Sequence, residues 1–216
     1  AASAIGLYDY AMNRLCGELG VKVLAIAGNH DSAERLASCA GLLDKAGLYL
    51  QGAAQREPRV VEFADSQVFF LPWMTEEKIK SLYPEERDGI TDLTEACRVA
   101  VNHMREKFIP GKHHLLLSHA FITNAETSTS DRAAEIGFAT QVPASVFEGF
   151  DYVALGHIHK PQQVNPFIRY SGSPMAYSFG KEERQEKSVT LIDTASMTQQ
   201  VLAAEARQPV LQLHVL

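Results

Sequence analysis

An apolar segment at residues 151–155 runs directly into Gly156-His157-Ile158-His159, and this junction constrains the fold more than any other part of the sequence. In extended backbone, residues two apart point the same way, with Cα atoms roughly 6.5 Å apart. Both imidazoles can therefore face one site, and each can reach a different ion of a metal pair, because paired hydrolytic metals lie about 3.5–4 Å apart. For the triplet alone, a solvated strand end is the structural alternative.

Two other apolar segments end in the same way. Residues 21–27 have the near-continuous apolar character of a parallel strand covered on both faces, and they run into Gly28-Asn29-His30-Asp31. Residues 114–118 end in His119. Ligand sites of open α/β sheets gather outside the carboxyl ends of strands, so the potential ligands at these three ends are expected to meet at one rim. Asn oxygen and imidazole nitrogen together suit Mn²⁺, Fe or Zn²⁺ better than Ca²⁺ or Cu.

Helical and extended patterns are distributed unevenly along the chain. The first half alternates strands with helical patterns at 5–19, 32–43, 78–83 and 91–108. The second half is dominated by strands, at 163–164, 168–171, 188–193, 199–203 and 210–215. This order predicts one layered α/β or α+β domain with sheets at its centre.

Composition excludes several classes of protein. The formal net charge is −6, so no global basic field attracts nucleic acid or an anionic membrane, and DNA binding would rely on local charge and bound cations. The three cysteines are odd in number and widely spaced, which argues against a disulfide framework or a structural zinc site. No apolar run approaches the roughly 20 residues needed to span a bilayer, so the sequence predicts a soluble, cytoplasmic protein.

Several other features have structural interpretations. Asp31 with Glu34 is expected to cap the helix that follows. Trp73 is assigned to the core, and the charged stretch 181–187 is interpreted as a solvated loop. The polar segment 123–141 is long for a loop within a domain, and such loops are more often functional than filler. The remaining histidines show no site spacing and are expected to be surface or packed residues: His103, His113, His114 and His214.

The three strand-end motifs resemble the later motifs of the calcineurin-like metallophosphoesterases. Within that superfamily, four further runs are similar to the SbcD-type nucleases, and the resemblance covers nearly the whole chain: 115–121, 141–144, 150–157 and 170–174. The resemblance implies a layered metallophosphoesterase fold, with a central β-sandwich flanked by helices and incomplete at the N-terminus.

The resemblance also implies roles for the strand-end residues. Asn29, His119 and His157 would hold one metal ion and His159 would belong to another, with Mn²⁺ favoured and Fe or Zn²⁺ as alternatives. His30 would not be a ligand. It would face the scissile phosphate, stabilising charge and protonating the leaving oxygen while hydroxide attacks in line at the two metals. A helix-cap contact is the structural alternative for His30.

The activity implied by the resemblance is that of a DNA phosphodiesterase. It would act as a 3′-to-5′ double-strand exonuclease and single-strand endonuclease in DNA repair and recombination, as a homodimer with an SbcC-like ATPase. Two alternatives remain open: another calcineurin-like phosphoesterase acting on nucleotides or phosphoproteins, and a non-catalytic scaffold with an incomplete site.

The Asp-x-His and Gly-Asp-x-x-Asp motifs of this superfamily are not found in residues 1–216. The resemblance therefore implies a partial nuclease domain over 1–216, with its first strand-helix portion missing before Ala1 and its capping region missing or only begun near 205–216. We expect residues 1–216 alone to be inactive. Cleavage of DNA with Mn²⁺ at the rate of a form extended at the N-terminus would contradict this expectation.

Overall fold

The computed structural model of the chain describes residues 2–128, 131, 141–179 and 182–205. Its centre is a mixed sheet of six strands: β3 (Val60–Glu62), β4 (Ser66–Leu71), β5 (His113–His119), β8 (Tyr152–Gly156), β9 (Gln162–Asn165) and β10 (Ile168–Tyr170). They follow the spatial order β3-β4-β5-β8-β10-β9. The four central strands run parallel, and β3 and β9 pair antiparallel at the edges. The predicted mixed α/β class is confirmed.

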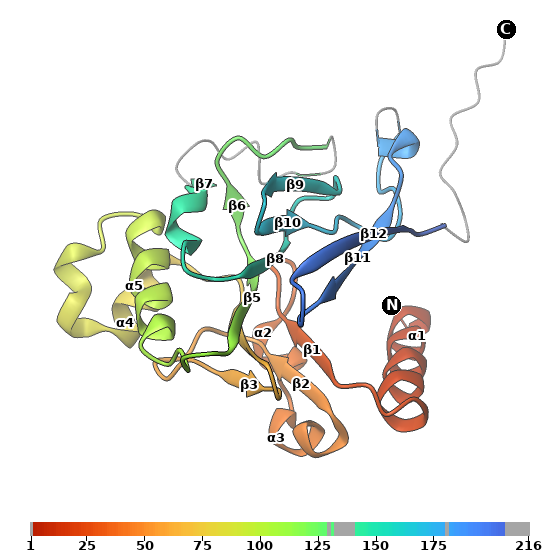
Figure 1. The fold of residues 1–216 in the computed structure, drawn as a ribbon, viewed down its shortest axis with the longest axis horizontal. Helices are drawn as coiled ribbons and strands as arrows, with labels where there is room; N and C mark the ends of the chain where they lie inside the picture. Colours follow the sequence, from red (N-terminus) through yellow and green to blue (C-terminus); the bar gives the residue numbers. More distant parts are fainter. Residues whose placement is uncertain (1, 129–130, 132–140, 180–181, 206–216) are drawn as a thin grey trace, which may run out of the picture.

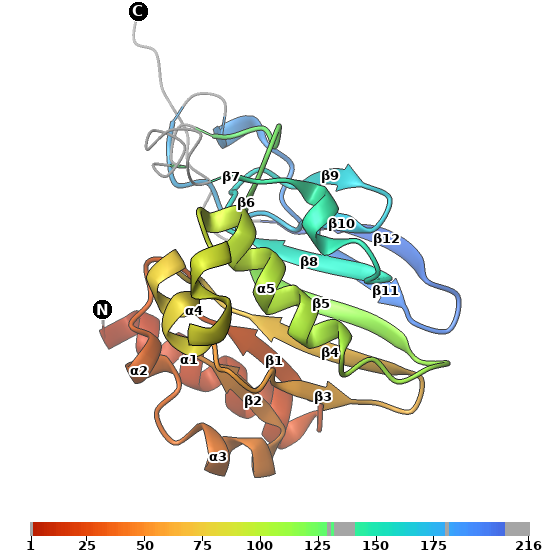
Figure 2. The same ribbon diagram turned by 90° about the vertical axis from the view of Figure 1, so that its left-hand side faces the viewer.

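Two helices cover one face of this sheet (Figure 1 and Figure 2): α4 (Glu76–Leu82) and α5 (Leu93–Arg105). Helix α5 is amphipathic, since its buried side chains Cys97, Val101 and Met104 recur at three- and four-residue steps. They belong to the same core as Phe69 and Leu116 of the sheet. This packing buries one face of the central strands. Because one face is buried, the register in which the strands pair is strongly specified.

Two smaller strand pairs lie over the opposite face of the sheet (Figure 1): parallel β1 (Val23–Ile26) and β2 (Leu48–Gln51), and antiparallel β11 (Ser188–Asp193) and β12 (Thr198–Ala203). Between them and the sheet lies a cavity of about 440 Å³, lined by side chains that include Leu24, Leu115 and Ile192. The expectation that 21–27 is covered on both faces is wrong. Strand β1 is only half-buried, because among the described strands it pairs with β2 alone and borders this cavity.

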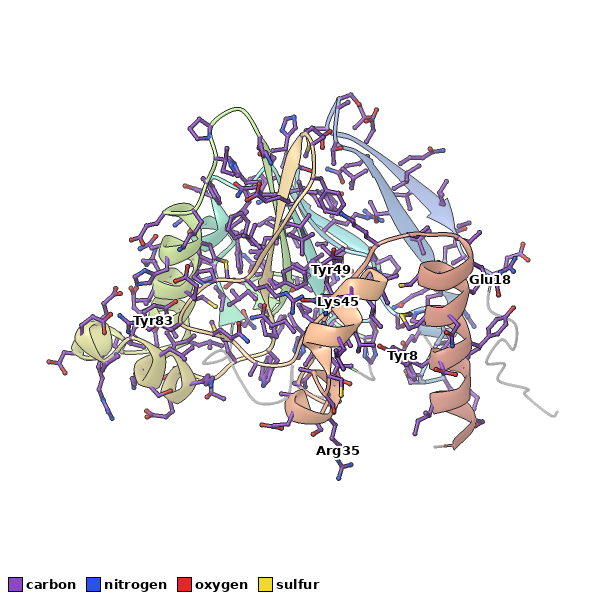
Figure 3. All side chains as sticks on the ribbon, turned by 90° about the horizontal axis from the view of Figure 1, so that it is seen from below. Tyr8, Glu18, Arg35, Lys45, Tyr49 and Tyr83 are labelled. Carbon is purple, nitrogen blue, oxygen red and sulfur yellow. The ribbon has the colours of Figure 1, made fainter. Side chains whose placement is uncertain are left out.

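The N-terminal helix α1 (Ala2–Met12) continues as a π-helical segment η1 (Asn13–Glu18). Apolar side chains of the helix predicted over 5–19 are exposed, since Ile5 is 69 % exposed and Leu19, just beyond the segment, is 59 % exposed. Figure 3 shows the helix as a separate column, with Tyr8 and Glu18, beside the segment that carries Arg35 and Lys45. The helix is therefore present as predicted, but it contributes little to the core.

The helix predicted over 32–43 is divided in two: α2 (Ala33–Leu36) and α3 (Ala40–Leu43), followed by the 3-10 turn η2 (Asp44–Ala46). Cys39, between them, has a φ of +60°, a left-handed conformation that interrupts the helical hydrogen bonding. The division shortens the helix that follows the Asn29-His30 loop to a single turn.

The remaining elements are short: β6 (Phe121–Ile122), β7 (Gln141–Val142), η3 (Pro84–Gly89), η6 (Ala144–Phe147) and η7 (Glu182–Arg184). The sequence pattern does not predict β2, and the strand expected at 210–215 lies outside the described residues. Much of the predicted loop 123–141 also lies outside them. Of the helices that the structure describes, none has both the length and the apolar character needed to cross a membrane.

The Tyr170→Phe change is expected to lower the free energy of unfolding by about 1–3 kcal/mol, because it removes the partner of two buried backbone groups. Tyr170 is completely buried. Its hydroxyl donates to the carbonyl of Ala120 at 2.6 Å and accepts from the amide of Ile122 at 3.0 Å. Urea unfolding would measure the change. Tyr10→Phe, at a side chain that is 65 % exposed, is the control, and equal stability of both variants would contradict the prediction.

Candidate metal centre

The carboxyl ends of β1, β5 and β8 meet at one rim, where the five predicted site residues surround a cavity of about 190 Å³: Asn29, His30, His119, His157 and His159. Strands β5 and β8 are neighbours, and their ladder pairs His119 with Gly156. A hydrogen bond ties the end of β1 to the same rim: the amide of Trp73, just after β4, donates to the carbonyl of Ala27, just after β1, at 3.0 Å. Residues that are 130 positions apart in sequence thus line one cavity, while their individual roles stay predictions.

His119 and Asn29 are in direct contact. The Nε2 atom of His119 lies 2.9 Å from Oδ1 of Asn29. The ring fits between two glycines, because a Cβ at Gly28 would lie 2.6 Å from its Cε1 atom and a Cβ at Gly156 would lie 2.8 Å from its Nδ1 atom. A side chain at either glycine would collide with the His119 ring in its present position, which gives a physical reason for glycine at each strand end.

His157 completes a cluster of rings. Its φ is +106°, a strained conformation for a residue with a side chain, and such outliers concentrate at functional sites. Its ring lies 5.2 Å from that of His119, at an interplanar angle of 75°. Trp73 stacks on His157 at 5.6 Å and meets His119 edge-on at 5.9 Å. The assignment of Trp73 to the core is therefore wrong: the indole is half-buried, lies outside the core cluster and contacts both site histidines. Its place just after β4 was the available signal.

Burial keeps these two imidazoles neutral. Desolvation lowers the pKa of His119 to about 4, with a smaller contribution from the neighbouring His157. Desolvation is also the largest cause that lowers the pKa of His157. A neutral imidazole is the form that binds a metal ion, so both rings are ready to act as ligands near pH 7.

The loop that carries Asn29 and His30 is closed by Asp31. Its Oδ2 atom accepts a hydrogen bond from the amide of Gly28 at 2.7 Å. The expected capping role of Asp31 is wrong, since the N-cap of α2 is Ser32 and that residue makes no side-chain cap bond. His30 is exposed at the edge of the cavity, as a group that meets a substrate would be.

His159 lines the same cavity, next to two acidic residues that the sequence pattern did not indicate. Its Nδ1 atom is 3.4 Å from Oδ1 of Asp131 and 3.7 Å from Oε1 of Glu182. Glu182 and Lys187 are buried, so the interpretation of 181–187 as solvated is wrong for both. Asp131 lies in the polar segment that was predicted to be functional, but no spacing signal distinguished it from its neighbours.

Two known proteins are similar in sequence to this chain over most of its length. No protein-family model matches the chain. It is 32 % identical over 191 residues to the SbcD subunit of the nuclease SbcCD from Staphylococcus epidermidis, across 88 % of this chain and 50 % of that protein. It is 33 % identical over 182 residues to the SbcD subunit of the same nuclease from Bacillus subtilis, across 79 % of this chain and 46 % of that protein. The chain is therefore similar to the SbcD subunit over 79–88 % of its own length. It spans about half the length of the curated SbcD relatives it matches.

The donor set at this rim fits a divalent ion. Two ligands bound side by side to an ion at about 2.1 Å have donor atoms roughly 3 Å apart. The 2.9 Å between Asn29 and His119 meets that requirement, and the ring of His157 is adjacent. Within the described part of the chain, no three His, Cys, Asp or Glu side chains are grouped closely enough to hold an ion by themselves. The amide oxygen of Asn29 is thus an essential part of the candidate set.

We expect the metal-free protein to lose stability as the pH falls from about 6.5 to 4. The pKa of His119 is about 4 when folded and 6.5 otherwise, so the unfolded state binds more protons in this window. The contribution of neutral His119 to the free energy of unfolding is fully present above 6.5, the pKa of this residue in the unfolded state. When the pH is lowered from 7 to 4.5, the free energy of unfolding should fall by about 2–3 kcal/mol less in His119→Gln than in the wild type, as measured by urea unfolding.

His113→Gln, at the opposite end of the same strand, is the matched control for this measurement. It should keep the pH dependence of the wild type. An unchanged pH dependence in His119→Gln would show that the His119 ring is not held in its neutral form by the fold.

Proposed function

We propose that this chain forms the metal-binding rim of an SbcD-type nuclease, a metal-dependent DNA phosphodiesterase. One observation carries the proposal: an amide and four imidazoles from three strand ends line a single cavity, in a chain that is 32–33 % identical to SbcD subunits. A non-catalytic scaffold has no need for a strained His157, a His119 ring enclosed by glycines and two imidazoles kept neutral by burial.

Asn29, His119 and His157 would hold one divalent ion, and His159 would belong to a second. We favour Mn²⁺, with Fe or Zn²⁺ as alternatives, because the set combines a hard amide oxygen with borderline imidazole nitrogens. When bound, such ions polarise a phosphodiester and supply a strong nucleophile at neutral pH. The protein contributes the spacing of the donors, the neutral state of the rings and a cavity of about 190 Å³ that these side chains line.

His30 would act on the substrate. It is next to Asn29 on the loop closed by the bond from Gly28 to Asp31, so its backbone position is tied to that of a ligand. Its exposed side chain can reach a phosphate at the edge of the cavity, stabilise negative charge and donate a proton to the leaving oxygen. This division of labour leaves metal binding to the half-buried rings and proton transfer to the exposed one.

The curated relatives are named as the SbcD subunit of the nuclease SbcCD, which supports the wider proposal for the whole protein. It would act on DNA as a 3′-to-5′ double-strand exonuclease and single-strand endonuclease in repair and recombination, in the cytoplasm. It would work as a homodimer with an SbcC-like ATPase. With a net charge of −6, contact with DNA would depend on bound cations and on local basic groups rather than on a global field.

We also propose that the chain is part of a layered metallophosphoesterase domain. The central sheet would form one layer of the sandwich, and the strands β1, β2, β11 and β12 would belong to the other. Their position over the face opposite α5, with an apolar cavity between, supports this arrangement (Figure 1).

Substitution of a ligand should abolish activity, and substitution of His30 should reduce it without loss of metal. In the intact nuclease subunit assayed on linear duplex DNA with Mn²⁺, His119→Ala should lose both Mn²⁺ binding and cleavage. His30→Asn should keep Mn²⁺ affinity and lower kcat by about 10²–10⁴-fold. His113→Ala is the control and should cleave like the wild type.

Two other substrates separate the alternatives. Turnover of p-nitrophenyl phosphate or a cyclic nucleotide without cleavage of DNA would replace the nuclease by another phosphoesterase. Absence of turnover on all three substrates would favour a scaffold. Full activity of His119→Ala would reject the proposed site itself.

A further inference from the structure

We propose that Asp131 and Glu182 are positioning residues that orient His159 for the second metal ion. The inference rests on the proposed function, since it assigns to His159 the role of a ligand. It goes beyond that function by naming the groups that fix which nitrogen of the ring faces the ion. Both acids come from segments remote from His159 in sequence, 28 residues before it for Asp131.

Asp131 fixes the backbone and the ring of His159 together. Its Oδ1 atom accepts a hydrogen bond from the amide of His159 at 2.9 Å and lies 3.4 Å from the ring Nδ1 atom. Its Oδ2 atom accepts from the amide of Ser128. The side chain of Asp131 is only 1 % exposed, so this carboxylate has exchanged water for these protein donors. A carboxylate that only stabilised the backbone of the surrounding loop would not need to lie beside the His159 ring.

The carbonyl of His159 is held from the opposite side. It accepts from the amide of Ser173 at 3.0 Å and from Nζ of Lys187 at 3.4 Å. Lys187 also donates to Oγ of Ser173 at 3.0 Å. The backbone of His159 is therefore fixed at both its amide and its carbonyl, which leaves the ring torsions as its main freedom.

Glu182 restricts that remaining freedom. It is completely buried, and its Oε1 atom lies 3.7 Å from Nδ1 of His159 and 3.7 Å from Nζ of Lys187. Its Oε2 atom accepts from the hydroxyl of Ser178 at 2.6 Å. Burying a carboxylate costs several kcal/mol unless it is paired and hydrogen-bonded. Both carboxylates lie near the same nitrogen of His159, and orienting this ring is the role that we assign to them.

The chemistry of the ring explains what the two carboxylates achieve. An imidazole that ligates a metal through one nitrogen donates the hydrogen on its other nitrogen to a carboxylate or carbonyl, and this bond fixes the tautomer and raises the basicity of the ligand. Nδ1 is the ring nitrogen that lies near both carboxylates, at 3.4 Å from Asp131 and 3.7 Å from Glu182, so we place the hydrogen on Nδ1 and the metal on Nε2. The arrangement is thus a carboxylate–histidine pair set before an ion arrives.

The first test reads the tautomer of His159 without metal. Long-range ¹H–¹⁵N NMR of the chain should show His159 protonated on Nδ1. Asp131→Ala and Glu182→Gln should each increase the fraction protonated on Nε2. The control Glu126→Gln removes a carboxylate that is 71 % exposed and paired with Lys160, the neighbour of His159, and it should match the wild type. Should Asp131→Ala fail to fold, Glu182→Gln decides the outcome.

The second test measures Mn²⁺ in the intact nuclease subunit by titration calorimetry. Asp131→Ala and Glu182→Gln should weaken the second Mn²⁺ by about 10–100-fold and leave the first unchanged. Wild-type tautomer and wild-type affinity in both variants, or an Nε2-protonated His159 in the wild type, would overturn the inference. Absence of Mn²⁺ binding and DNA cleavage in the wild type would instead reject the proposed function, and the tautomer measurement separates the two failures.

Discussion

The register between β5 and β8 is the constraint on which the candidate site depends. Their ladder places His119 opposite Gly156, so that the imidazole crosses a position without a side chain. Because side chains alternate along a strand, a slip of one residue would turn His119 toward the face covered by α5 and bring Ser118 to the rim. The packing of α5 and Leu116 in one core therefore helps to position His119 at the rim, because it disfavours the slipped register.

The histidines that line the cavity are held by two different physical means. His119 and His157 are supported by the indole of Trp73 and by the absence of side chains at the glycines, and burial keeps them neutral. His159 is instead surrounded by buried charge from Asp131, Glu182 and Lys187. Two ions at this rim would experience different surroundings, one with neutral donors and one beside carboxylates.

Much of this arrangement could be predicted from local sequence. Apolar runs that end in Asn29, His119 and His157 indicate strands, and the carboxyl ends of neighbouring parallel strands meet at one edge. The contacts of Asp131 and Glu182 could not be predicted, because a carboxylate in a polar or charged stretch looks solvated until tertiary structure encloses it. The incomplete cover of β1 was missed for a similar reason: an apolar pattern reports what a strand can bury and not what lies against it.

Trp73 gives this rim a built-in optical reporter. It is the single tryptophan of the chain, and its indole contacts the rings of both His119 and His157. Indole emission responds to the charge and ligation of groups in contact with the ring, so all intrinsic fluorescence of tryptophan in this chain originates beside the candidate ligands. Events at the rim are thereby visible in the unlabelled protein.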